Sequence, residues 1–227
     1  MDLQQLASVG GFFALRSGTS PTAVPLAEVY AGDGARLAAR VDTVTARLAA
    51  PEVRIGVSVA QLGLAARLCS VALGGAALYG RVLDLDPRRL SWDPDGSSPD
   101  DLWLDAVRTL PVEALGDSLV EGHLAPLAAA LRRRYRIAEP LLWGNAGSAL
   151  AGAVRALHTW AGSAGRPEVA ERALDLGADL FCRPELRGTG TLGALPRFRR
   201  RSCCLYYRCP GGGVCGDCCF DRAPGRG

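Results

Sequence analysis

Cysteines crowd the C-terminal end of this chain, which has 227 residues and eight cysteines. Six of them fall within one short segment, at Cys203, Cys204, Cys209, Cys215, Cys218 and Cys219. Cys215 and Cys218 form a C-x-x-C pair, a spacing that places two thiolates on one metal centre. Cys203 and Cys204 are adjacent, and adjacent side chains of extended backbone point to opposite sides. Both can reach one centre only if the backbone bends sharply there, or if the centre is wider than one atom. A two-iron cluster, which takes four thiolates, is such a centre.

Zinc is the main alternative, because a tetrahedral zinc site also takes four thiolates. Such sites are usually built from two C-x-x-C knuckles, and the adjacent pair Cys203-Cys204 is not one. The spacing therefore favours an iron–sulfur cluster over zinc, and over redox-active or unliganded thiols. The other two cysteines, Cys69 and Cys182, lie in apolar helical contexts, and we expect both in the core.

The elements that must position these thiols are mostly helices. Apolar stripes and turn residues predict a buried central helix at 55–79, further helices at 139–160 and 167–181, and strands at 82–86 and 102–107. We expect the two strands to pair antiparallel, and a short strand at 12–15. The fold class is thus α+β and helix-dominated, with a small antiparallel β element. We place a helix-rich body at residues 1–196 and a C-terminal iron–sulfur-binding appendage at residues 197–227.

Composition excludes several classes of protein. Hydrophobic residues make up 48% of the chain, enough for a packed core rather than disorder. The net charge of +3 implies no broad face for nucleic acid. The apolar stretch 55–79 carries Gln61 and Arg67 in its middle, which favours a buried helix over a membrane span. The N-terminus lacks the charge pattern of a signal peptide, so we expect a cytoplasmic protein whose thiols stay reduced.

The cysteine spacing C-C-x10-C-x2-C, formed by Cys203, Cys204, Cys215 and Cys218, resembles the signature of the FhuF family of ferric-siderophore reductases. The flanking runs 199–202, 207–208 and 215–218, and the triplet 143–145, agree with that family. The resemblance implies a [2Fe-2S] cluster on these four cysteines and the reduction of cytoplasmic ferric siderophores, with the body as the siderophore-docking part. Cys209 and Cys219 are additional thiols within the segment, and either is a competing ligand or a small apolar filler.

Several other residues are candidates for contact with the substrate or the electron donor: Arg197, Arg199, Arg200, Arg201 and Asn145. The arginines adjoin the cysteines and would raise the cluster potential, attract an anionic chelate or donor, or form a solvated basic loop. Asn145 is polar within an apolar helix, needs a hydrogen-bond partner, and is a candidate to face the chelate pocket. His123 and His158 have the spacing of ordinary helix-face residues.

The chain has no glycine-rich dinucleotide fingerprint, so a separate electron donor, a ferredoxin or a reductase, is expected. A second basic run, at residues 132–136, suits a helix C-terminus, with weak contact to an anionic membrane surface as the alternative. Two other functions remain open at this point: a zinc-binding interaction module and a cluster-based redox sensor. The sequence does not specify the siderophore.

Overall fold

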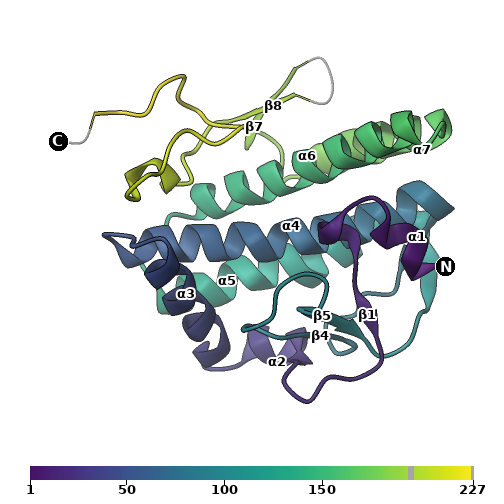
Figure 1. Ribbon diagram of the computed structural model, residues 1–227, viewed down its shortest axis with the longest axis horizontal. Helices are drawn as coiled ribbons and strands as arrows, with labels where there is room; N and C mark the ends of the chain where they lie inside the picture. The colour runs from purple at the N-terminus through teal and green to yellow at the C-terminus, as the bar shows by residue number, and fades with distance from the viewer. Residues whose placement is uncertain (194–196, 226–227) are drawn as a thin grey trace.

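The computed structural model describes residues 1–193 and 197–225. Helix α4 (Val53–Tyr79) runs through the centre of the molecule. Around it pack α3 (Ala35–Arg47), α5 (Ala125–Arg134), α6 (Glu139–Ser163) and α7 (Pro167–Phe181). Figure 1 shows α6 on one side of α4 and α5 on the other, with the C-terminal segment lying over α6. The helix-dominated fold and the helices predicted at 139–160 and 167–181 are confirmed.

Helix α4 is central because it is apolar on nearly every side. By length and composition it is the one helix in the described residues that could cross a membrane, but 72% of its apolar window is buried within the protein. Its buried charged residue, Arg67, is 3% exposed and forms an ion pair with Asp101 at 2.9 Å. The same guanidinium donates to the carbonyls of Gly11, Phe12 and Ala14, and so holds the N-terminal arm against the helix.

Small sheets flank the helices. In the larger one, β1 (Arg16–Ser17), β5 (Leu102–Leu104), β4 (Leu90–Trp92) and β2 (Val24–Pro25) lie in that order. Its β5–β4 and β4–β2 pairs are antiparallel, whereas β1 and β5 are parallel. A separate pair joins β3 (Arg81–Leu83) to β6 (Thr109–Pro111), and a third joins β7 (Gly190–Leu192) to β8 (Phe198–Arg200).

Two strand predictions are wrong. The segments 82–86 and 102–107 do not pair with each other, because the chain turns at Asp86, whose carbonyl accepts from the Arg89 and Leu90 amides. That turn brings β4 back beside β5 and leaves β3 to pair with β6. Residues 12–15 form no strand either. Gly11–Phe13 is a 3₁₀ turn, and Arg67 binds carbonyls there that a neighbouring strand would need.

The remaining helical segments are short. They are α1 (Leu3–Ala7), α2 (Leu26–Ala31), the 3₁₀ turns Val112–Ala114 and Tyr206–Arg208, and a π-helix at Asp117–Leu124. The π-helix carries His123, which is fully buried. Its Nε2–H donates to the Leu85 carbonyl at 2.6 Å, so Nδ1 accepts from the Tyr30 hydroxyl at 3.0 Å. His123 is therefore the structural residue that its helical spacing predicts.

The basic run at the end of α5 is bonded within the protein. Arg132 forms an ion pair with Glu139, Arg133 donates to the Tyr30 carbonyl, and Arg134 donates to the Asp33 carbonyl. These contacts match the prediction of a helix C-terminus. Contact with a membrane stays an untested alternative.

The predicted boundary between body and appendage falls at residues 196 and 197. Residues 194–196 lie outside the described residues. The β7–β8 pair joins the two sides of this boundary in one hairpin. The C-terminal segment thus begins as part of a sheet that rests on the helical body.

Candidate metal centre

Strand β8 fixes the start of the cysteine segment. Phe198 and Arg200 point into the protein, whereas Arg199 between them is exposed, as the two-residue period of a strand requires. The Phe198 ring stacks on Phe181 of α7, with ring centroids 5.3 Å apart. Because of this alternation, Arg200 is buried whereas its neighbours Arg199 and Arg201 are exposed.

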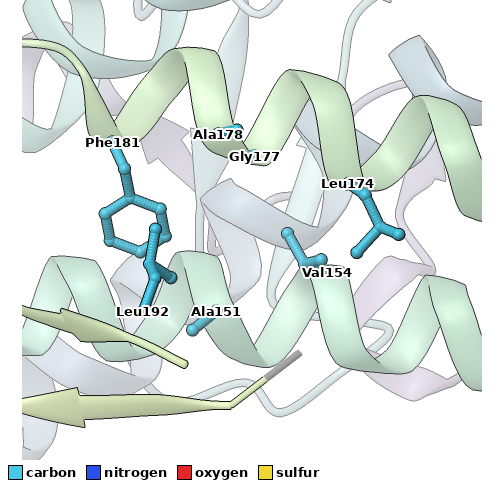
Figure 2. A pocket seen from close by; sticks show the side chains of 7 residues that line it. All are labelled: Ala151, Val154, Leu174, Gly177, Ala178, Phe181 and Leu192. Carbon is cyan, nitrogen blue, oxygen red and sulfur yellow. The ribbon is translucent and has the colours of Figure 1, made fainter. Parts of the chain in front are cut away.

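The hairpin is anchored in the crevice between α6 and α7. Figure 2 shows Leu192 of β7 beside Phe181, with both side chains over Ala151 of α6. The free space there is about 10 Å³, which is at most about one water molecule. The crevice is therefore a packing contact that holds the hairpin, not a ligand site.

Two glycines of α6 let the segment approach the helix closely. A Cβ at Gly144 would lie 2.0 Å from the Ser202 hydroxyl oxygen and 3.1 Å from Nη2 of Arg200. A Cβ at Gly147 would lie 3.0 Å from the Phe198 ring. These positions exclude larger residues and place Cys203 and Cys204 directly above the helical core. Ser58 of α4 completes the attachment by donating to the Cys204 carbonyl at 2.8 Å.

Two of the thiols are in contact. The sulfurs of Cys204 and Cys215 lie 3.7 Å apart. Tetrahedral coordination with metal–thiolate bonds of about 2.3 Å puts two sulfurs about 3.8 Å apart, so this pair fits one metal atom. Cys203 lies near Cys218 and Cys219, close enough for their charges to interact. Over residues 1–193 and 197–225, no three His, Cys, Asp or Glu side chains converge as they would around one ion.

The four predicted ligands share one kind of backbone contact. Cys203 accepts from the Leu205 amide at 3.2 Å, and Cys218 accepts from the Phe220 amide at 3.4 Å. Cys204 and Cys215 likewise interact with the amides two residues ahead, at 206 and 217. Each of these thiols thus has an N–H donor at position i+2, which favours thiolate over thiol. For Cys219 the backbone contact is with its own amide.

The backbone bends directly after the adjacent cysteines Cys203 and Cys204. Leu205 has φ of +68°, a left-handed conformation that non-glycine residues seldom adopt, and a 3₁₀ turn follows it. The chain therefore reverses directly after Cys204. After this bend Cys204 contacts Cys215, and Cys203 lies close enough to Cys218 for their charges to interact.

The thiol pKa values reflect this crowding. The hydrogen bond with Cys215 lowers the pKa of Cys204 to about 7, and the same contact raises the pKa of Cys215. Burial raises the pKa of Cys203, and burial together with the nearby Cys218 raises that of Cys219.

Arg200 lies beneath the thiols with no counter-charge from the protein. It is 2% exposed, and no carboxylate among the described residues forms an ion pair with it. Nη2 donates to Asn145 Oδ1 at 2.7 Å, whereas Nε and Nη1 have no hydrogen-bond partner among the described residues. Its charge lowers the pKa of Cys203, Cys204 and Cys215, although burial and sulfur contacts have larger effects. A buried, uncompensated guanidinium is costly, so this position fits an anionic group bound at the thiols.

Asn145 connects this cation to both central helices. Its Nδ2 donates to the Ser58 carbonyl at 2.9 Å and lies 3.1 Å from the Ser58 hydroxyl, which itself binds the Cys204 carbonyl. Asn145 is fully buried, so it does not face a chelate pocket as expected. Its need for a partner is met by Arg200, which it holds in place.

The opposite side of the centre is held by an ion pair. Arg155 of α6 binds Asp217 through both carboxylate oxygens, at 2.8 and 3.1 Å. The Asp217 carbonyl accepts from the Arg200 amide at 2.9 Å. The loop between Cys215 and Cys218 is thereby fixed to the helical body from two directions.

Two family models match the chain. Residues 76–202 match the model described as ferric iron reductase FhuF-like transporter, and residues 200–227 match the FhuF 2Fe-2S C-terminal domain. The chain belongs to the FhuF family. No curated protein matches it.

The second match indicates that this FhuF-family protein carries a [2Fe-2S] cluster. The donor set agrees, because all four thiols have amide donors at position i+2, and the charge of the buried Arg200 acts on Cys203, Cys204 and Cys215. Cys203, Cys204, Cys215 and Cys218 would hold the cluster. That assignment remains a prediction, as do the roles of the arginines.

The other predicted residues divide by exposure. Arg197, Arg199 and Arg201 are exposed, and Arg199 forms an ion pair with Asp221 and donates to the Cys219 carbonyl. Cys209 is buried, and its role stays open with that of Cys219.

The two isolated cysteines differ. Cys69 is buried in α4, where burial raises its pKa to about 12, as expected for a core residue. The prediction for Cys182 is wrong. It caps the C-terminus of α7, and its side chain is exposed because the helix ends there.

Sequence reasoning missed Ser58, Arg155 and Asp217. Arg155 has a recognisable signal, because it is the only charged residue between Pro140 and Ser163 of an apolar helix. Asp217 lies inside the C-x-x-C loop and is buried. A lone charge on α6 and a buried acid in the loop are natural partners. Ser58 has no such signal.

Proposed function

We propose that the chain is a siderophore-iron reductase of the cytoplasm. In this proposal one electron from the [2Fe-2S] centre reduces a ferric siderophore and releases Fe(II). A separate ferredoxin or reductase restores the electron. The family matches support reduction of ferric iron.

The observation that carries the proposal is the arrangement of the four cysteines. Each thiol has an amide donor two residues ahead, and the charge of the buried Arg200 acts on Cys203, Cys204 and Cys215. A bound [2Fe-2S] cluster supplies a one-electron redox centre. The chain's own residues hold that centre rigidly, through Ser58 at the Cys204 carbonyl and Arg155 at Asp217.

The chemistry of the substrate explains why reduction releases iron. A siderophore binds Fe(III) through hard oxygen donors, and these bind Fe(II) much more weakly. Each 59 mV of unfavourable potential costs about a factor of ten in a one-electron equilibrium. Trapping of Fe(II) can offset that factor by mass action. No nucleophile or proton-transfer base is required.

The cysteine loop is accessible to a large substrate. A cavity of about 700 Å³ reaches Cys215 and Cys218 from the side of β8, between Arg197 and Arg199. A second cavity, of about 340 Å³, reaches Cys215 from the side of α4 and α6. Pockets of these sizes accommodate small-molecule ligands. A chelate and a donor protein thus have separate approaches to the centre.

The test uses purified holoprotein under anaerobic conditions. After reduction by dithionite and removal of the excess, a ferric siderophore should restore the oxidised visible spectrum while an Fe(II) indicator develops colour. Ferricyanide serves as the control oxidant, because a small outer-sphere oxidant needs no docking site. A protein that ferricyanide reoxidises but no ferric chelate does would contradict the proposal and favour a redox sensor. Colourless protein with zinc and no iron would favour the interaction module.

A further inference from the structure

The smaller of the two cavities has the features of a ligand site. Its floor is formed by α4 and α6, with Leu62 and Ala66 on one helix and Ala149 and Ala153 on the other. Cys215 and its loop form one wall, and Phe12 stands at the rim, 50% exposed. A molecule in this cavity would therefore contact apolar surface and a predicted cluster ligand together.

Besides Arg200, whose Nε and Nη1 also lack a partner, one buried polar group that lines this cavity has no partner among the described residues. Ser148 is 8% exposed, and its hydroxyl has no hydrogen-bond partner among the described residues. Buried hydroxyl groups are normally hydrogen-bonded, because burial removes their hydrogen bonds to water and a hydroxyl without a protein partner has none to replace them. A ligand oxygen in the cavity would accept this hydrogen bond.

The charges along the cavity indicate the kind of ligand. Arg155 and Asp217 both line it, but they neutralise each other. Arg200 supplies the remaining charge, and its position beneath the thiols makes it the counter-ion of the bound cluster. A strongly anionic chelate would lose its hydration here without gaining cations. The apolar floor instead suits a chelate of low net charge with carbon linkers.

We infer that this cavity is the docking site of the ferric chelate, with Ser148 as a hydrogen-bond donor and Phe12 as an apolar cover. The inference rests on the proposed function, since it names the place where the substrate of that reaction binds. The larger cavity, which Arg197 and Arg199 border, is left for the electron donor or another anionic partner.

Gly152 offers a variant that fills the cavity without disturbing the fold. It lines the cavity, and a Cβ there would have only Arg155 Nη2 nearby, at 3.8 Å. Leucine also favours helix more than glycine does. Gly162→Leu is the matched control, because Gly162 lies on the same helix, is exposed, and has no atom near its Cβ position. Thr191→Trp, on an exposed strand position, fills the other cavity.

The experiment measures docking and electron transfer separately. Docking is followed with redox-inert Ga(III) chelates added to oxidised holoprotein, one a neutral trihydroxamate and one a trianionic tricatecholate. Electron transfer is followed as reoxidation of reduced protein by the Fe(III) trihydroxamate, with ferricyanide as control.

Gly152→Leu should weaken binding of the neutral Ga(III) chelate and slow reoxidation by its Fe(III) form at least tenfold. Reoxidation by ferricyanide should be unchanged, and Gly162→Leu and Thr191→Trp should behave as wild type. The trianionic chelate should bind wild type more weakly than the neutral one.

Wild-type behaviour of Gly152→Leu would overturn the inference, as would a loss of binding confined to Thr191→Trp. Tighter binding of the trianionic chelate would overturn the charge argument. Failure of the proposed function looks different. In that case wild-type protein would bind the Ga(III) chelate, yet no Fe(III) chelate would reoxidise it.

Discussion

Removal of the Arg200 charge should lower the midpoint potential of the centre. Reduction adds one negative charge, and a nearby cation stabilises the reduced state more than the oxidised state. Arg200 is 2% exposed, so solvent screens it little. Among the described residues, the side-chain hydrogen bonds of Arg200 go to oxygen and not to sulfur, so for an order-of-magnitude calculation we assume a charge separation of about 8 Å. Two unit charges at that distance interact by about 2 kcal/mol at an effective dielectric constant of about 20.

This interaction converts into a measurable shift. Since about 1.4 kcal/mol corresponds to about 59 mV for one electron, Arg200→Gln should lower the potential by roughly 85 mV. Arg200→Lys keeps the charge and should recover more than half of the shift. Arg199→Gln is the matched control, because Arg199 is exposed and paired with Asp221. At a dielectric constant of about 80, its effect should stay near 20 mV or less.

The assay is an anaerobic redox titration of the holoprotein, followed by visible absorption and by the electron paramagnetic resonance signal of the reduced form. Iron and sulfide content confirms that each variant is loaded equally. A potential for Arg200→Gln within about 20 mV of wild type would refute the reasoning, since an exposed charge predicts a shift of that size. Equal shifts for the Arg200 and Arg199 variants would refute it as well.

Three further predictions concern the fold. Gly144→Ala should release the cluster more readily, as measured by loss of visible absorbance on mild heating, because the added methyl group collides with the C-terminal segment; Gly162→Ala should not. Asp101→Asn should lower the free energy of unfolding in urea by about 3 kcal/mol, because it leaves a buried arginine unpaired, whereas Asp100→Asn, at an exposed ion pair, should change it by less than about 1 kcal/mol. Burial lowers the pKa of His123 to about 4, below the value of about 6.5 in unfolded chains, so the unfolded state takes up the proton first. Stability should therefore be complete above pH 6.5 and fall by roughly 3 kcal/mol as the pH drops to 4, a slope that denaturant titrations of His123→Gln should lack.

The sequence predicted the long helices well because their signals are local. Pro167 and the apolar period define α7, and continuous hydrophobicity defines α4 as the core helix. Strand pairing was beyond the same reasoning. The strands have two or three residues each, and their partners depend on the turn at Asp86 and on Arg67, which lies far away in the sequence.

The candidate centre divides in the same way. Cysteine spacing favoured an iron–sulfur centre, and the resemblance to the FhuF signature named the four thiols as its predicted ligands, because ligand spacing is a local property of the sequence. The sequence did not show which arginine of the basic run is buried. The structure does, because alternate residues of strand β8 point into the protein and toward solvent. Only the fold brings Asn145, Ser58 and Arg155 to the cysteine segment, since these residues come from helices that precede it by many residues. Cys182 was wrongly predicted to be buried, because its apolar neighbours gave no sign that the helix ends there.

The most direct test of the account is the stoichiometry of a single anaerobic titration. Holoprotein reduced by one electron is titrated with a ferric siderophore, while visible absorption reports the oxidised centre and a chromogenic chelator reports Fe(II). The account predicts that one equivalent of chelate reoxidises one equivalent of protein and yields one Fe(II). Reoxidation without Fe(II), or no reoxidation by any ferric chelate while ferricyanide still reacts, would contradict it.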